Sequence, residues 1–74
     1  MKENLIIKQN LKNLLKEYSK KHKISINEII KKAGINEKLY FQYLSVPNRR
    51  IPSIWIAKIS KVTNIPANDF FKGI

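Results

Sequence analysis

The sequence has few of the residue types that proteins use for chemistry. Its 74 residues include no cysteine, one histidine, two glycines and five acidic residues. The lack of cysteine excludes disulfides and cysteine-ligated zinc. The acidic residues form no pair at catalytic or metal-ligand spacing, and two glycines cannot build a glycine-rich phosphate loop. We therefore expect no enzyme activity, no metal, no cofactor and no small-molecule ligand.

Long apolar stretches are also missing. No uninterrupted apolar run is longer than Ile54 to Ala57. A membrane span needs roughly 20 such residues, and the core of a signal peptide needs about 7 to 15. The sequence therefore predicts a cytoplasmic protein that does not contact a membrane.

Positive charge is present in excess. Fifteen Lys and Arg against five Asp and Glu leave a net charge of +10. Such a field favours a polyanionic partner, with nucleic acid ahead of an anionic membrane surface. The hydrophobic share of 43% is typical of a folded chain. We expect a single domain over residues 1–74.

Apolar periodicity predicts helices and no strands. An amphipathic helix is expected from about Lys2 to Lys21 because apolar residues recur at offsets of four, three and four. These apolar residues are Ile7, Leu11, Leu14 and Tyr18. The lysines between them are expected on another face of the helix: Lys8, Lys12, Lys16 and Lys20.

A helix-turn-helix is predicted from Ser25 to Ser45. Ser25 and Glu28 form a capping box at the start of a short second helix, expected from about Ile26 to Ala33. Gly34 can supply the left-handed residue that ends this helix. Two short helices joined through a glycine are typical of motifs that place their second helix in the major groove of DNA.

The third helix is expected from about Glu37 to Ser45, with Asn36 as its N-cap. It should bury Tyr40, Tyr43 and Leu44 and expose a polar face. Phe41 is open to several roles, including contact with a thymine methyl group or with a partner protein; we expect core packing.

Two prolines bracket the basic segment that follows. Pro47 and Pro52 flank Asn48, Arg49, Arg50 and Ile51, since neither proline fits a helix interior. A fourth helix restarts at Ser53; because Ile54 to Thr63 is apolar almost all round, it is expected in the centre of the bundle. A last helical turn is expected from about Pro66 to Phe71.

These features resemble the lambda-repressor-like (Cro/C1-type) helix-turn-helix domains over nearly the whole chain. The resemblance is carried by residues 25–36, by Pro52-Ser53, by Asn64-Ile65-Pro66 and by Asp69-Phe70-Phe71. It implies an all-α, compact five-helix bundle whose third helix reads double-stranded DNA. It also implies a homodimer on a twofold-symmetric operator, acting in transcription regulation as a repressor.

The resemblance assigns roles to individual residues. Base readout falls on the outward face of the third helix, at Glu37, Lys38, Gln42 and Ser45. Phosphate contacts are expected from Asn36, Asn48, Arg49 and Arg50. The sequence departs from the family at Ile26, where a phosphate-binding glutamine is common, and in a longer segment after the third helix. No DNA contact is therefore assigned to Ile26.

Other interpretations compete with DNA binding. The outward residues of the third helix are also compatible with an ordinary solvated face. The chain can instead be a protein-interaction module, an adaptor that keeps the fold without reading bases and uses Phe41 and Phe70-Phe71 as its contact surface. Lysines and arginines gathered beside the third helix would favour DNA, and an uncharged apolar patch there would favour a protein partner.

Overall fold

The structure, a computed structural model, describes residues 2–46 and 48–73. In chain order the elements are α1 (Lys2–His22), α2 (Ile26–Lys32), α3 (Glu37–Ser45), α4 (Ser53–Thr63) and the 3-10 helix η1 (Ala67–Phe71). These residues contain no strand, so the all-α prediction is confirmed. Pro47, expected to open the basic segment, lies outside the described residues.

The last helical turn, expected from about Pro66 to Phe71, is present, but the five-helix bundle that the resemblance implied is not confirmed. Residues Ala67–Phe71 form a single 3-10 turn, which begins after Pro66 and is followed by Gly73 at φ +94°. Between Pro66 and Gly73 the chain has little room for α-helical hydrogen bonds. Short helical segments of this kind commonly adopt 3-10 geometry. The described residues therefore form four α-helices and one 3-10 turn.

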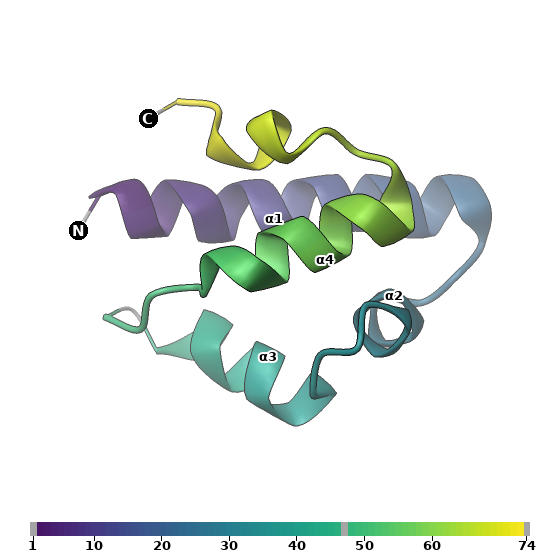
Figure 1. Ribbon diagram of the computed structural model, residues 1–74, viewed down its shortest axis with the longest axis horizontal. Coiled ribbons are helices and arrows are strands. Elements are labelled where there is room, and N and C mark those ends of the chain that lie inside the picture. Colours follow the sequence, from purple (N-terminus) through teal and green to yellow (C-terminus); the bar gives the residue numbers. More distant parts are fainter. Residues whose placement is uncertain (1, 47, 74) are drawn as a thin grey trace.

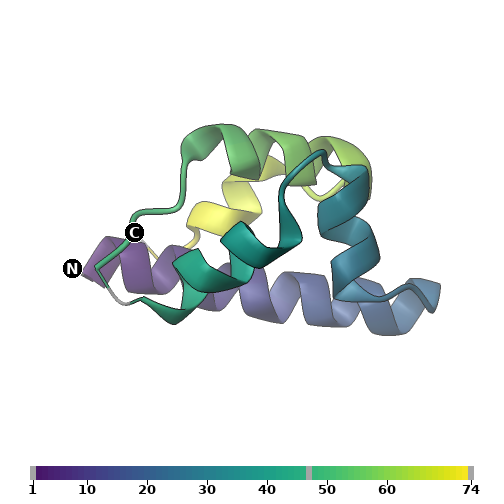
Figure 2. The ribbon, with the colours of Figure 1, turned by 90° about the horizontal axis from the view of Figure 1, so that it is seen from below.

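The helices are arranged around the long α1. Figure 1 shows α1 running behind α4, with η1 on one side of these two helices and α2 and α3 on the other. Both α1 and α4 pack against α2 and η1. In Figure 2, which views the molecule from the α3 side, α3 faces the reader. The third helix therefore lies at an edge of the molecule, where one of its faces is open to a partner.

A single apolar cluster, to which every helix contributes, forms the core. Its largest fully buried side chains are Tyr40, Phe70, Leu11, Leu15, Ile29, Ile30, Ile56 and Ile59. Polar contacts attach η1 to α1: the Asn10 side-chain amide donates to the carbonyls of Phe70 and Lys72, both at 2.9 Å. Among the described residues, no helix combines the length and apolar character needed to cross a bilayer.

Local signals in the sequence placed the starts of α2 and α3 correctly. The Ser25 hydroxyl accepts from the Glu28 amide at 3.2 Å, and the Asn36 side chain accepts from the Leu39 amide at 3.0 Å. Gly34 has φ +76°, the left-handed conformation that lets the chain leave α2. Each signal acts over three or four residues, which is why it could be read without the rest of the fold.

The inward face of α1 differs from the predicted one. Its most buried residues are Asn4, Lys8, Leu11 and Leu15. The buried stripe therefore runs between the predicted apolar face and the predicted lysine face, and Lys8 is only 4% exposed. The prediction was wrong for Lys8 because its amine finds a partner on a distant segment, a contact that periodicity cannot show.

The outward face of α4 also departs from expectation. Ile54 is 58% exposed, whereas Trp55, Ile56 and Ile59 are buried. The helix thus packs one face inward and is not surrounded by protein. It ends at Asn64, which adopts φ +61° and donates its backbone N–H to the Ser60 carbonyl. Asparagine tolerates this left-handed conformation better than most residues.

Candidate nucleic-acid interface

The exposed face of α3 carries three of the four residues expected to read bases. Lys38, Gln42 and Ser45 follow one another at offsets of four and three, so they line one face of the helix. All three are exposed, and Glu37 is half-buried in the first turn. The Ser45 hydroxyl donates to the Phe41 carbonyl at 2.9 Å, which leaves its oxygen as an acceptor.

Phe41 lies on the surface and not in the core. Its side chain is 39% exposed, and its ring packs edge-on against Tyr40, with the centroids 5.2 Å apart and an interplanar angle of 82°. The neighbouring Tyr40 fills the core position. The expectation of core packing for Phe41 was therefore wrong, and α3 presents an aromatic ring beside its polar face.

Asn36 has a structural role at the N-terminus of α3. Its side-chain oxygen caps the helix through the Leu39 amide, so a phosphate contact would have to come from the side-chain nitrogen. The capped position leaves the first turn of α3 fixed in direction. Any ligand in front of α3 would meet Asn36 and Glu37 together.

Arg49 is held beside the C-terminal half of α3. Its guanidinium lies 5.0 Å from the centroid of the Tyr43 ring, a cation–π contact. Tyr43 in turn packs on the buried Trp55, with ring centroids 4.9 Å apart. The guanidinium therefore rests on a stack of rings that reaches from the surface into the core.

The backbone of the segment between α3 and α4 is anchored by α1. The Asn4 side-chain amide donates to the Arg49 carbonyl at 2.7 Å, and the Lys8 Nζ donates to the Val46 carbonyl. Val46 is the C-cap of α3, where the helix dipole favours a positive charge. Burial lowers the pKa of Lys8, and Lys12 lowers it further. Sequence reasoning missed both anchors; the spacing of Asn4, Lys8, Leu11 and Leu15 on one face was the available signal.

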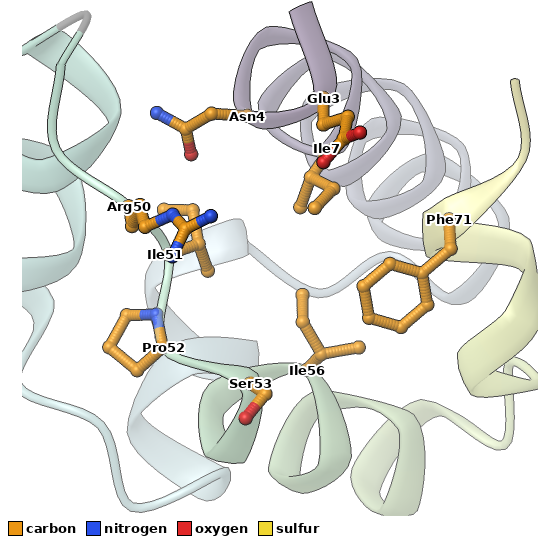
Figure 3. A pocket seen from close by; sticks show the side chains of 9 residues that line it. All are labelled: Glu3, Asn4, Ile7, Arg50, Ile51, Pro52, Ser53, Ile56 and Phe71. Atoms are coloured by element: carbon orange, nitrogen blue, oxygen red, sulfur yellow. The ribbon is translucent and has the colours of Figure 1, made fainter. Parts of the chain in front are cut away.

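Arg50 faces a different region from Arg49. It lines a hollow of about 660 Å³, together with residues of α1, α4 and η1. Figure 3 shows Ile7, Ile56 and Phe71 around this hollow, with Glu3 at the top beside Ile7 and Arg50 at the left beside Ile51. Asn48 is exposed in the turn before the two arginines. The four predicted phosphate contacts are thus spread over two ends of α3 and are not gathered at one point.

Positive charge gathers beside α3 from another direction as well. Lys12 and Lys16 of α1 line a second hollow with Phe41 and Ser45 of α3. The basic residues around α3 therefore include Lys8, Lys12, Lys16, Lys38 and Arg49, and Glu37 in its first turn is acidic. A field of this sign attracts a polyanion.

The hollow near Arg50 offers no recognisable catalytic arrangement. Its polar side chains are Glu3, Asn4, Arg50 and Ser53, which do not include a histidine or cysteine. Within residues 2–46 and 48–73 no group of three or more His, Cys, Asp or Glu side chains is placed to hold a metal ion.

Comparison of the chain with protein-family models, with curated proteins and with solved structures finds no match. The resemblance to lambda-repressor-like domains accordingly rests on the residues of this chain alone and stays a prediction.

Proposed function

We propose that this protein binds double-stranded DNA in a sequence-specific manner and regulates transcription, with α3 in the major groove. The resemblance to lambda-repressor-like domains adds that it binds as a homodimer to a twofold-symmetric operator and acts as a repressor. Reading helices of such a dimer would enter successive major grooves about 34 Å apart.

One observation carries the proposal. Two short helices meet at the left-handed Gly34, and the second exposes Lys38, Gln42 and Ser45 along one face at the edge of a +10 chain. Lysine can donate to guanine and glutamine can pair with adenine through two hydrogen bonds, both in the major groove. Glu37 can accept from cytosine at the start of the same helix.

The ends of the neighbouring helices support phosphate contacts. Arg49 is positioned by Tyr43, and Arg50 lies next to the first turn of α4. No side chain caps α4 at Pro52, so its first amides have no side-chain acceptor. A phosphate at this helix N-terminus would be favoured by the helix dipole and by Arg50 together. Contacts of this kind set the register of a protein on DNA, and the reading helix recognises the base sequence.

The proposal is tested by selecting binding sites from random duplex DNA. We expect enrichment of a twofold-symmetric motif, with affinity for that motif falling steeply as salt rises. If each subunit neutralises about four to six phosphates, the log-log slope should be about −0.9 per phosphate contacted. No enrichment, or an affinity that does not change with salt, would contradict DNA binding.

Replacing Gln42 by alanine distinguishes base readout from general electrostatic attraction to DNA. Gln42→Ala should cost about 1–3 kcal/mol at one base pair of the selected site and leave binding to unrelated duplexes unchanged. Arg49→Ala is the contrasting variant, because it should weaken all duplexes nearly alike. Both effects are measured by fluorescence anisotropy on the selected site and its single-base variants. Parallel losses on every duplex from both changes would show that Gln42 does not read bases.

A further inference from the structure

A shallow groove lies between α1 and α3, on the flank of the helix assigned to DNA. Its volume is about 320 Å³. The residues that line it, called here the α1–α3 groove, are Lys12, Leu15, Lys16, Ile26, Tyr40, Phe41, Leu44 and Ser45. Ligand pockets have volumes of about 300–1,000 Å³. This groove is at the lower limit, which suits a few side chains and not a whole helix.

The groove is apolar along its length. Leu15 and Tyr40 belong to the buried core, and Ile26 and Leu44 are partly buried against that core. Phe41 forms the solvent-exposed wall, held edge-on by Tyr40. Exposed apolar side chains beside an apolar hollow favour an occupant that brings its own apolar side chain.

The polar groups of the groove select for negative charge. Lys12 and Lys16 stand one turn apart on α1, both exposed, and no acidic residue lines the groove. Neither lysine takes part in an ion pair within the described segments, where the recorded pair is Lys72 with Asp69. The two ammonium groups are therefore available to carboxylates of another molecule.

We propose that the α1–α3 groove binds an acidic peptide segment of a partner protein, with an apolar anchor side chain against Phe41 and carboxylates on Lys12 and Lys16. Duplex DNA is the less suitable occupant, because its phosphates would meet the two lysines without filling the apolar floor. A segment bound there would lie against Phe41 and Ser45 and compete with DNA for α3. This competition rests on the proposed function, whereas peptide binding does not.

The test begins with a display selection of random twelve-residue peptides on the full chain in 150 mM salt, which screens distant charges. We expect enriched sequences that combine an aromatic or branched apolar residue with flanking Asp or Glu. One enriched peptide is then synthesised with a fluorescent label, and its affinity is measured by anisotropy. Phe41→Ala and Lys12→Glu should each weaken its binding at least tenfold.

Two matched variants separate the groove from general attraction to a basic protein. Leu39 is as exposed as Phe41, at 39%, and lies on the same helix outside the groove, so Leu39→Ala should leave the peptide affinity unchanged. Lys20 is an exposed lysine of α1 outside the groove, so Lys20→Glu controls for the change of charge. Equal losses in a variant and its control would overturn the proposal, as would a failure to enrich any peptide.

Competition with DNA tests the regulatory step on its own. The labelled duplex from the site selection should be released as the unlabelled peptide is added. If the peptide binds without releasing the duplex, the proposed competition is wrong, and the groove remains a peptide-binding site. Loss of duplex binding in Phe41→Ala, with no peptide enriched, would assign the groove to DNA and overturn the proposal. If the unmodified protein binds no duplex, the proposed function is wrong. The peptide measurements still show whether the α1–α3 groove binds an acidic peptide.

Discussion

Replacing Phe70 by alanine is expected to lower the free energy of unfolding by about 3–5 kcal/mol. The ring is fully buried although it belongs to a single 3-10 turn, and it joins η1 to the core formed by α1 and α4. A domain of this length is stable by only roughly 0.05–0.15 kcal/mol per residue, so the loss would be a large part of the total. Urea unfolding followed by circular dichroism measures it.

The next residue provides the control for this variant. Phe71 is 38% exposed and belongs to the same turn. Phe71→Ala removes an identical side chain from the surface, so it should cost much less than Phe70→Ala. Similar losses for the two variants, or a loss below about 1 kcal/mol for Phe70→Ala, would show that η1 is not packed as described.

Replacing Lys8 by methionine should free the backbone that follows α3. Methionine keeps the length of the side chain but cannot donate to the Val46 carbonyl, and a hydrogen bond to a charged group contributes about 1.5–3 kcal/mol. The Arg49 amide also donates to that carbonyl, at 3.1 Å. We therefore expect reduced stability and faster hydrogen exchange of the Arg49 amide, measured by NMR.

Lys12→Met is the matched variant for Lys8→Met. Lys12 lies one turn further along α1, is exposed, and makes no hydrogen bond within the described part of the chain. Both variants remove one positive charge, so a general electrostatic loss in DNA affinity should be shared. A larger loss for Lys8→Met would show that the loop anchor matters for the interface. Equal stability and equal exchange at Arg49 would contradict the anchoring role.

Features encoded within a few residues were predictable. The caps at Ser25 and Asn36 and the left-handed Gly34 depend on backbone groups close by in sequence, and the start of α3 followed from them. The exposure of Lys38 and Gln42 followed from helical periodicity once those bounds were known. This part of the candidate site therefore needed no knowledge of the remaining chain.

Features that depend on distant partners were not predictable. Lysine is rarely buried, so the sequence predicts Lys8 at the surface. Its buried position is explained only by its hydrogen bond to the Val46 carbonyl at the end of α3. Phe41 and Tyr40 are adjacent aromatic residues, and the packing of α3 against the core decides which of them is buried. The placement of Arg49 on Tyr43 likewise needs the stack on Trp55, which comes from another helix.

The polar anchors of α1 have a consequence for the order of folding. Asn4, Lys8 and Asn10 bind carbonyls that lie 38 to 62 residues away in sequence. Closing loops of that length costs more entropy than closing the few residues between α2 and α3. The pair α2 and α3 can therefore form as a local unit, and α1 is secured only when the segments around Val46 and Phe70 have been positioned. Folding kinetics of Lys8 and Asn10 variants should accordingly show faster unfolding with little change in the folding rate.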